Sequence, residues 1–287
     1  MADGLYDPDM EGEELAPQGD QVLPLEQIAG MGIDLAFELP EDTLQRVAAE
    51  CLEHYERDKS ERAEWDGDYD KIVEMVRGAR NQKSFPWVGA SNVKYPLIAT
   101  AAVQFNARAY PAIVKGKDVV KARVNGDDPD GQKRERADRI QEHMNWQLLE
   151  ENPEWEEETD KLTMMLPIHG CVFRQVIWDQ TYSRHKTSLV SAKDLVVTQN
   201  AKDLETVPMF TKVFPLFEHE ITSKMRLGEY LKSEIAYDGD EKQGEQEMLE
   251  CHCRYDLDED GYDEPYIAVI HKESGKLLSL KAGFWPD

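Results

Sequence analysis

The acidic turn at residues 256–264 carries the side chains best arranged to bind a ligand. Carboxylates or glycine occupy its first, third, fifth, sixth and ninth positions: Asp256, Asp258, Asp260, Gly261 and Glu264. This matches the first half of a calcium loop, in which alternate carboxylates converge on one hard cation and glycine permits a sharp turn. The twelfth position is Ile267, where such a loop has glutamate. The turn therefore predicts either a Ca²⁺ site or a solvated turn between two strands, and we expect no other cofactor to be required.

A second group of metal-ligand residue types is the tripeptide Cys251-His252-Cys253. In a strand, the two thiols would face one side of the sheet and the imidazole the other. A structural zinc site needs four ligands, usually as two spaced pairs, and no second pair follows. We therefore expect these cysteines to be ordinary buried residues.

Positive charge is concentrated in one part of the sequence. The residues concerned are Lys115, Lys117, Lys121 and Arg123, followed by four more basic residues between 133 and 139. Such a group could contact a phosphate backbone, pair with acidic residues of a neighbouring subunit, or form a solvated charged face. The sequence leaves these three interpretations open.

Recognised catalytic motifs are absent from the sequence. It contains neither a Gly-x4-Gly-Lys-Ser/Thr loop nor a Gly-x-Gly-x-x-Gly segment after a strand, so we expect no ATP hydrolysis. There is no Gly-x-Ser-x-Gly elbow, and the seven histidines are scattered. We expect the chain not to be an enzyme, although a hydrolase built on dispersed carboxylates and histidines stays an alternative.

The composition is strongly acidic. The 287 residues carry 33 Lys and Arg against 58 Asp and Glu, a formal net charge of −25. Phosphates would be repelled by most of such a surface, which argues against general attraction to nucleic acid. No apolar run reaches the roughly 18 residues of a membrane span, so we expect no membrane association. Four cysteines are too few for a disulfide framework in a chain of this length.

Residues 1–40 contain no lysine or arginine, because the first basic residue is Arg46. Acidic residues are interspersed with glycine and proline, a composition that predicts a flexible acidic arm over residues 1–40. Residues 41–170 form a mainly helical region. Helical spacing from Glu41 to Tyr55, Pro96 before a third helix, and Gly170 after a fifth helix support this interpretation.

Residues 171–287 are predicted to be rich in strands, with one helix at residues 218–232. An additional strand is expected earlier, at Val119–Val124, from its alternating pattern. Helices that precede mostly antiparallel strands predict an α+β fold.

Several structural segments together resemble one family. They are residues 85–98 (FPWVGASNVKYPLI), residues 107–112 (ARAYPA), residues 166–173 (LPIHGCVF), residues 192–197 (AKDLVV) and the turn ending in residues 264–267 (EPYI). In content and order, over about residues 60–281, they resemble the N-terminal part of portal proteins of tailed bacteriophages.

The resemblance implies a function that the composition alone would not suggest. Portal proteins form rings, usually dodecameric, at one capsid vertex, through which a terminase motor drives double-stranded DNA. By this resemblance we expect the chain to assemble with copies of itself. We also expect it to contact terminase, head-completion or tail proteins, and capsid or scaffold proteins. DNA would pass through the ring without sequence-specific contacts. The chain would be found in the virion after assembly in the host cytoplasm. It would hold the wing-like part and end before the stem, clip and crown. The competing hypothesis is a calcium-dependent interaction module built on the turn at Asp256–Gly261.

Overall fold

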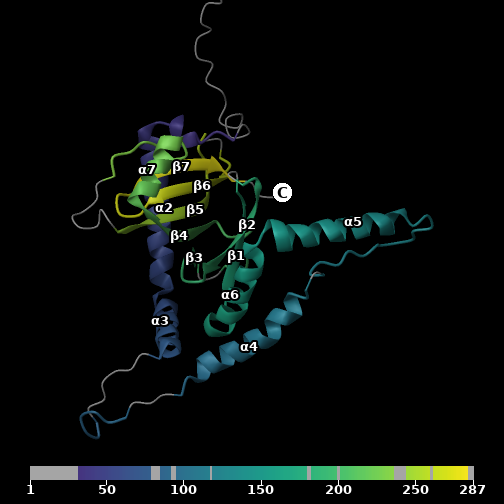
Figure 1. The fold of residues 1–287 in the computed structure, drawn as a ribbon. Coiled ribbons are helices and arrows are strands. Elements are labelled where there is room, and N and C mark those ends of the chain that lie inside the picture. Colours follow the sequence, from purple (N-terminus) through teal and green to yellow (C-terminus); the bar gives the residue numbers. More distant parts are fainter. Residues whose placement is uncertain are drawn as a thin grey trace, which may run out of the picture.

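The computed structural model describes residues 32–78, 85–91, 95–116, 118–179, 182–198, 201–235, 244–258 and 261–283. Within these ranges the helices come first and the strands follow, so the predicted α+β class is confirmed. All strand pairs are antiparallel. A body of sheets covered by helices lies at one side of the molecule, and helices α3, α4 and α5 extend away from it (Figure 1).

The body is built on a five-stranded sheet with the order β3-β4-β5-β6-β7. Its strands are β3 (Leu195–Val197), β4 (Met209–Phe217), β5 (Glu245–Tyr255), β6 (Glu264–His271) and β7 (Lys276–Ala282). Helix α7 (Glu218–Leu227) follows β4 directly, and Gly228 ends this helix in the left-handed conformation that glycine adopts without strain. A separate two-stranded sheet joins β1 (Val172–Asp179) to β2 (Arg184–Ser191).

Both faces of the five-stranded sheet are covered, and alternation along β5 shows how. Leu249, Cys251 and Cys253 face helix α2 (Glu41–Glu61) and the short helix η1 (Leu35–Phe37) in the main core. Met248 points to the opposite face, where it packs with Ile221 of α7. This two-residue period is that of a strand buried on both faces.

The remaining helices bury much less. They are α3 (Ala63–Arg77), α4 (Leu97–Ile113), α5 (Gln132–Trp146), η2 (Gln147–Glu151) and α6 (Glu154–His169). No residue of α3 is buried, and the single buried residues of α4 and α5 are Ala102 and Asn145. These helices therefore gain little stability from the core of the same chain.

Several sequence-based boundaries change in the structure. Val119–Val124 was predicted to be a strand, yet it pairs with no strand among the described residues. The helix predicted for residues 218–232 ends at Leu227. Residues 1–40 were predicted to be a flexible arm, whereas the chain already packs against β7 from Asp34. Residues 1–31 lie outside the described part.

Asp34 fixes the beginning of the described chain on the sheet. Its side chain accepts hydrogen bonds from the backbone N–H of Ala36 (3.0 Å) and of Leu280 (2.8 Å), and from the Ser279 hydroxyl (2.5 Å). Leu35 beside it has no exposed surface. An aspartate at the N-cap, where its oxygen satisfies free N–H groups, thus also joins η1 to a strand at the other end of the sequence.

Candidate functional site: the exposed surface of α4 and α5

Helix α4 is apolar on two sides, and only one of them is covered. Ala102 faces α6 and is buried, whereas Leu97, Ala101 and Phe105 follow one another at four-residue intervals on an exposed face. Leu97 is 67% exposed and Phe105 is 42% exposed. A helix with apolar residues all round normally lies within a larger core. The exposed stripe of α4 is therefore a candidate contact surface.

The covered side of α4 contacts α6 largely through polar side chains. Asn106 donates a hydrogen bond to Asp160 (2.9 Å) and accepts one from Thr163 (2.7 Å). The Tyr110 hydroxyl donates to Glu156 at 2.5 Å, which raises the pKa of Tyr110 to about 12 because the phenol proton is held by a carboxylate. These directional bonds fix how α4 lies on α6 and leave its apolar stripe facing outward.

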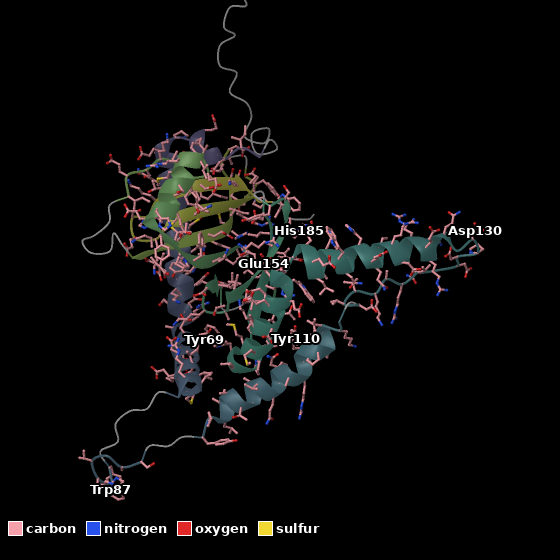
Figure 2. The ribbon with its side chains drawn as sticks, viewed as in Figure 1. Tyr69, Trp87, Tyr110, Asp130, Glu154 and His185 are labelled. Carbon is pink, nitrogen blue, oxygen red and sulfur yellow. The ribbon has the colours of Figure 1, made fainter. Side chains whose placement is uncertain are left out.

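Helix α6 is in turn fixed to the two-stranded sheet by an ion pair and a hydrogen bond. The Arg184 guanidinium on β2 donates to both carboxylate oxygens of Glu154 at 2.8 and 2.5 Å, and this lowers the pKa of Glu154. Arg174 on β1 donates to the Thr159 hydroxyl at 2.7 Å. Figure 2 shows Glu154 and His185 close to the point where α6 meets β1 and β2.

Helix α3 is held by aromatic and charged contacts. The Tyr69 ring stacks on His169 with a centroid separation of 4.4 Å, and its hydroxyl lies 2.9 Å from the Ser191 hydroxyl. Burial lowers the pKa of His169, so the imidazole favours its neutral form. At the junction of α2 and α3, Arg62 donates to the carbonyl oxygens of Ala192, Lys193 and Leu195. No sequence pattern predicts this arginine anchor.

The α5 hairpin (residues 118–151) projects from the body, with Asp130 at its far end (Figure 2). Residues 118–124, here called the edge segment, run beside α5. Asn145 accepts a hydrogen bond from the Val120 N–H (2.8 Å) and donates to the Val120 carbonyl (3.1 Å). Gln141 accepts from the Ala122 N–H at 3.1 Å. Alternate residues therefore turn their backbone groups toward α5, which is the two-residue period of a strand.

The predicted basic residues fall on or beside this edge segment. Lys121 and Arg123 are exposed on it, and Lys115 is exposed just before it. Lys117 lies outside the described residues. The structure thus brings Lys121 and Arg123 onto one strand-like segment.

An apolar loop lies at the opposite end of the molecule from the α5 hairpin. Trp87 marks this place in Figure 2. Phe85, Trp87 and Val88 are all exposed, Trp87 at 66%. Large apolar side chains grouped in this way indicate a surface that contacts another molecule.

The structure describes three of the four residues predicted to bind calcium: Asp256, Asp258 and Glu264. Asp256 accepts a hydrogen bond from the Gly261 N–H (2.8 Å), and Glu264 accepts one from the Tyr266 hydroxyl (3.2 Å). Asp258 is exposed, and Asp260 lies outside the described residues. Among the described residues no group of three or more His, Cys, Asp or Glu side chains is arranged to hold a metal ion. The calcium site stays a prediction.

The three residues Cys251, His252 and Cys253 alternate as the sequence predicts. Both cysteines are buried beside Cys51 of α2, whose thiol hydrogen-bonds with theirs. These bonds and burial raise the pKa of Cys51, so this thiol stays protonated. His252 stacks on Phe210 and contacts Glu250 at 3.2 Å.

The sequence matches no protein-family model, and a search of curated proteins finds no match. Among the described residues no helix is both long and apolar enough to cross a bilayer.

Proposed function

We propose that this chain is a structural subunit of a viral portal, which assembles with copies of itself into a ring around a DNA conduit. The observation that carries the assembly part is the apolar stripe of α4, exposed opposite the side that contacts α6. The portal part rests on the segments that resemble that family, one of which, residues 85–98, contains the exposed Trp87 and Leu97, the first residue of the α4 stripe.

The outer helices support a role that is completed by contact between copies. Helices α3, α4 and α5 together expose many large apolar side chains and bury almost none. Because a short helix is marginal without packing, such helices are stabilised best when another copy covers them. A passive conduit also agrees with a sequence that contains no motor motif and with a charge that would let DNA slide.

The partners follow from the same proposal. In a virion, the ring would contact terminase, head-completion or tail proteins, and capsid or scaffold proteins, after assembly in the host cytoplasm. Double-stranded DNA would pass without sequence-specific contacts.

The experiment that tests this proposal is the mass of the purified chain by light scattering, followed by electron microscopy of the largest species. We expect a mass of many subunits and annular particles. A monomer at every protein and salt concentration would contradict a self-assembling ring subunit.

A matched pair of variants locates the contact. Phe105→Glu puts a charge on the α4 stripe and should shift the mass toward that of one subunit. Leu227→Glu makes the same change at a 75%-exposed leucine of α7, outside the α4 surface, and should leave the mass unchanged. Equal effects of the two variants would show that α4 is not the contact.

A further inference from the structure

The edge segment has one side of its backbone paired and the other side open. Val120 and Ala122 direct their backbone groups to Asn145 and Gln141 of α5. Val119, Lys121 and Arg123 must then direct theirs away from α5, and these N–H groups form no hydrogen bond within the described residues. A strand-like edge of this kind is a template for an added strand from another segment.

Charge identifies which segment fits. The exposed side chains of Lys121 and Arg123 are two residues apart, so in a strand they lie on one face. Near the N-terminus of the same sequence, Asp7, Asp9, Glu11 and Glu13 repeat at the same two-residue interval, with no lysine or arginine before Arg46. Opposite charges directly across a strand pair stabilise it.

The backbone pattern of the acidic residues is also compatible with such pairing. If Asp7 and Asp9 direct their backbone groups to the edge segment, Pro8 between them faces away. Proline has no N–H group, and it is tolerated on the outer side of an edge strand.

We propose that residues 7–13 of one copy of this chain add as a strand to the edge segment, residues 118–124, of another copy. The proposal rests on the proposed function in its choice of a second copy. Asp34 anchors the chain on β7, so residues 1–31 precede a fixed point. The 20 residues between Glu13 and Asp34 span at most about 70 Å when fully extended, and this is the length available to reach the edge segment of another copy.

The first test measures binding of a fluorescent peptide with the sequence of residues 1–20. The receptor is the full chain in which Asp7, Asp9, Glu11 and Glu13 are replaced by their amides, so that its own N-terminal segment does not compete. We expect saturable binding at about 50 mM salt that weakens as salt rises. Adding Lys121→Glu and Arg123→Glu to the receptor should weaken binding about tenfold or more.

Two controls separate strand pairing from general attraction. Arg134→Glu with Arg136→Glu makes the same change in charge on the exposed surface of α5 and should leave binding within about twofold. A peptide of equal composition, in which the acidic residues no longer alternate, should bind about fivefold more weakly than the native peptide. Equal binding of both peptides, or an equal loss with both receptor variants, would overturn the proposal.

Mixing distinguishes contact between copies from contact within one chain. The amide variant retains the edge segment, and the Lys121→Glu, Arg123→Glu variant retains the acidic residues. If pairing occurs between copies, mixing the two variants restores cross-linking between residues 7–13 and 118–124. If cross-links form only within the unmixed wild-type chain, the choice of a second copy is wrong.

A duplex DNA of random sequence is the remaining probe. It should not displace the peptide from the receptor, and displacement through Lys121 and Arg123 would assign the edge segment to DNA instead. These outcomes can be told apart from a failure of the proposed function. If the chain binds the peptide but forms no ring, only the proposed function is contradicted. If the chain forms a ring that is unaffected by the edge variants and binds no peptide, only this inference is contradicted.

Discussion

Replacing Asp34 tests whether one carboxylate holds the beginning of the described chain on the sheet. Its Oδ1 accepts from two backbone N–H groups, those of Ala36 and Leu280, and its Oδ2 accepts from the Ser279 hydroxyl. The carboxylate is buried, at 8% exposure. Asp34→Ala would leave the buried Leu280 N–H without an acceptor and remove three hydrogen bonds to a charged group.

The size of the effect follows from these three bonds. A hydrogen bond to a charged group contributes about 1.5–3 kcal/mol, and an unsatisfied buried donor costs about 1–3 kcal/mol. Since the bonds share one acceptor group, the sum is not additive, and we expect Asp34→Ala to lower the free energy of unfolding by about 4 kcal/mol. Asp34→Asn keeps Oδ1 for both backbone donors, and its amide can donate to the Ser279 oxygen. Asp34→Asn should therefore lower the free energy of unfolding by only about 1 kcal/mol.

Urea unfolding at neutral pH measures both variants, and hydrogen exchange reports the Leu280 amide directly. We expect this amide to exchange faster in Asp34→Ala and to remain protected in Asp34→Asn. If the free energies of unfolding of both variants lay within about 0.5 kcal/mol of the wild-type value, the Asp34 carboxylate would not anchor η1 on the sheet.

Three further predictions concern the body. Arg62→Lys should lower the free energy of unfolding, measured by urea titration, by about 2 kcal/mol, because an ammonium cannot reach three carbonyl oxygens as the guanidinium does. The control is Arg46→Lys at an exposed position, which should lower the free energy of unfolding by less than about 0.5 kcal/mol. Burial lowers the pKa of His271 in the folded chain. Between that lowered pKa and the usual 6.5, the unfolded chain binds more protons than the folded chain, so the free energy of unfolding should fall as the pH drops through this range. His271→Gln should make the free energy of unfolding depend less steeply on pH in the same range. Cys171 is the one exposed cysteine, so a thiol reagent should modify one group in the native chain and four after unfolding. The native Cys171→Ser variant should contain no fast-reacting thiol, and any such thiol would show that the α2–β5 packing is wrong.

The sequence predicted the fold class well because its signals are local. Helical spacing from Glu41 coincides with the first residue of α2, and Gly170 ends α6 in the left-handed conformation. Alternation along Cys251-His252-Cys253 correctly placed the two thiols on one face. Each of these features depends on neighbours along the chain, which periodicity reports.

The contacts that anchor the chain and position the candidate site were less predictable because they join distant positions. Nothing in the sequence links Asp34 to Leu280, or Arg62 to the carbonyl oxygens near Lys193. Val119–Val124 shows the opposite case: its alternation is that of a strand, and its backbone does repeat every two residues, yet its hydrogen bonds go to side chains of α5. The pattern predicted the local conformation but not the partner.

Assembly of so acidic a chain has to overcome repulsion between copies. Each copy carries a formal charge of −25, and this repulsion is long-ranged at low salt, where the Debye length is about 30 Å at 0.01 M. Burial of the α4 stripe does not depend on screening, whereas pairing at Lys121 and Arg123 weakens as salt rises. Moderate salt would therefore relieve the general repulsion while high salt removes the local attraction. If ring formation depends on both contacts, the fraction of chains in rings should be greatest at intermediate salt. In the Lys121→Glu, Arg123→Glu variant this fraction should not decline at high salt, because only the apolar contact holds its copies together.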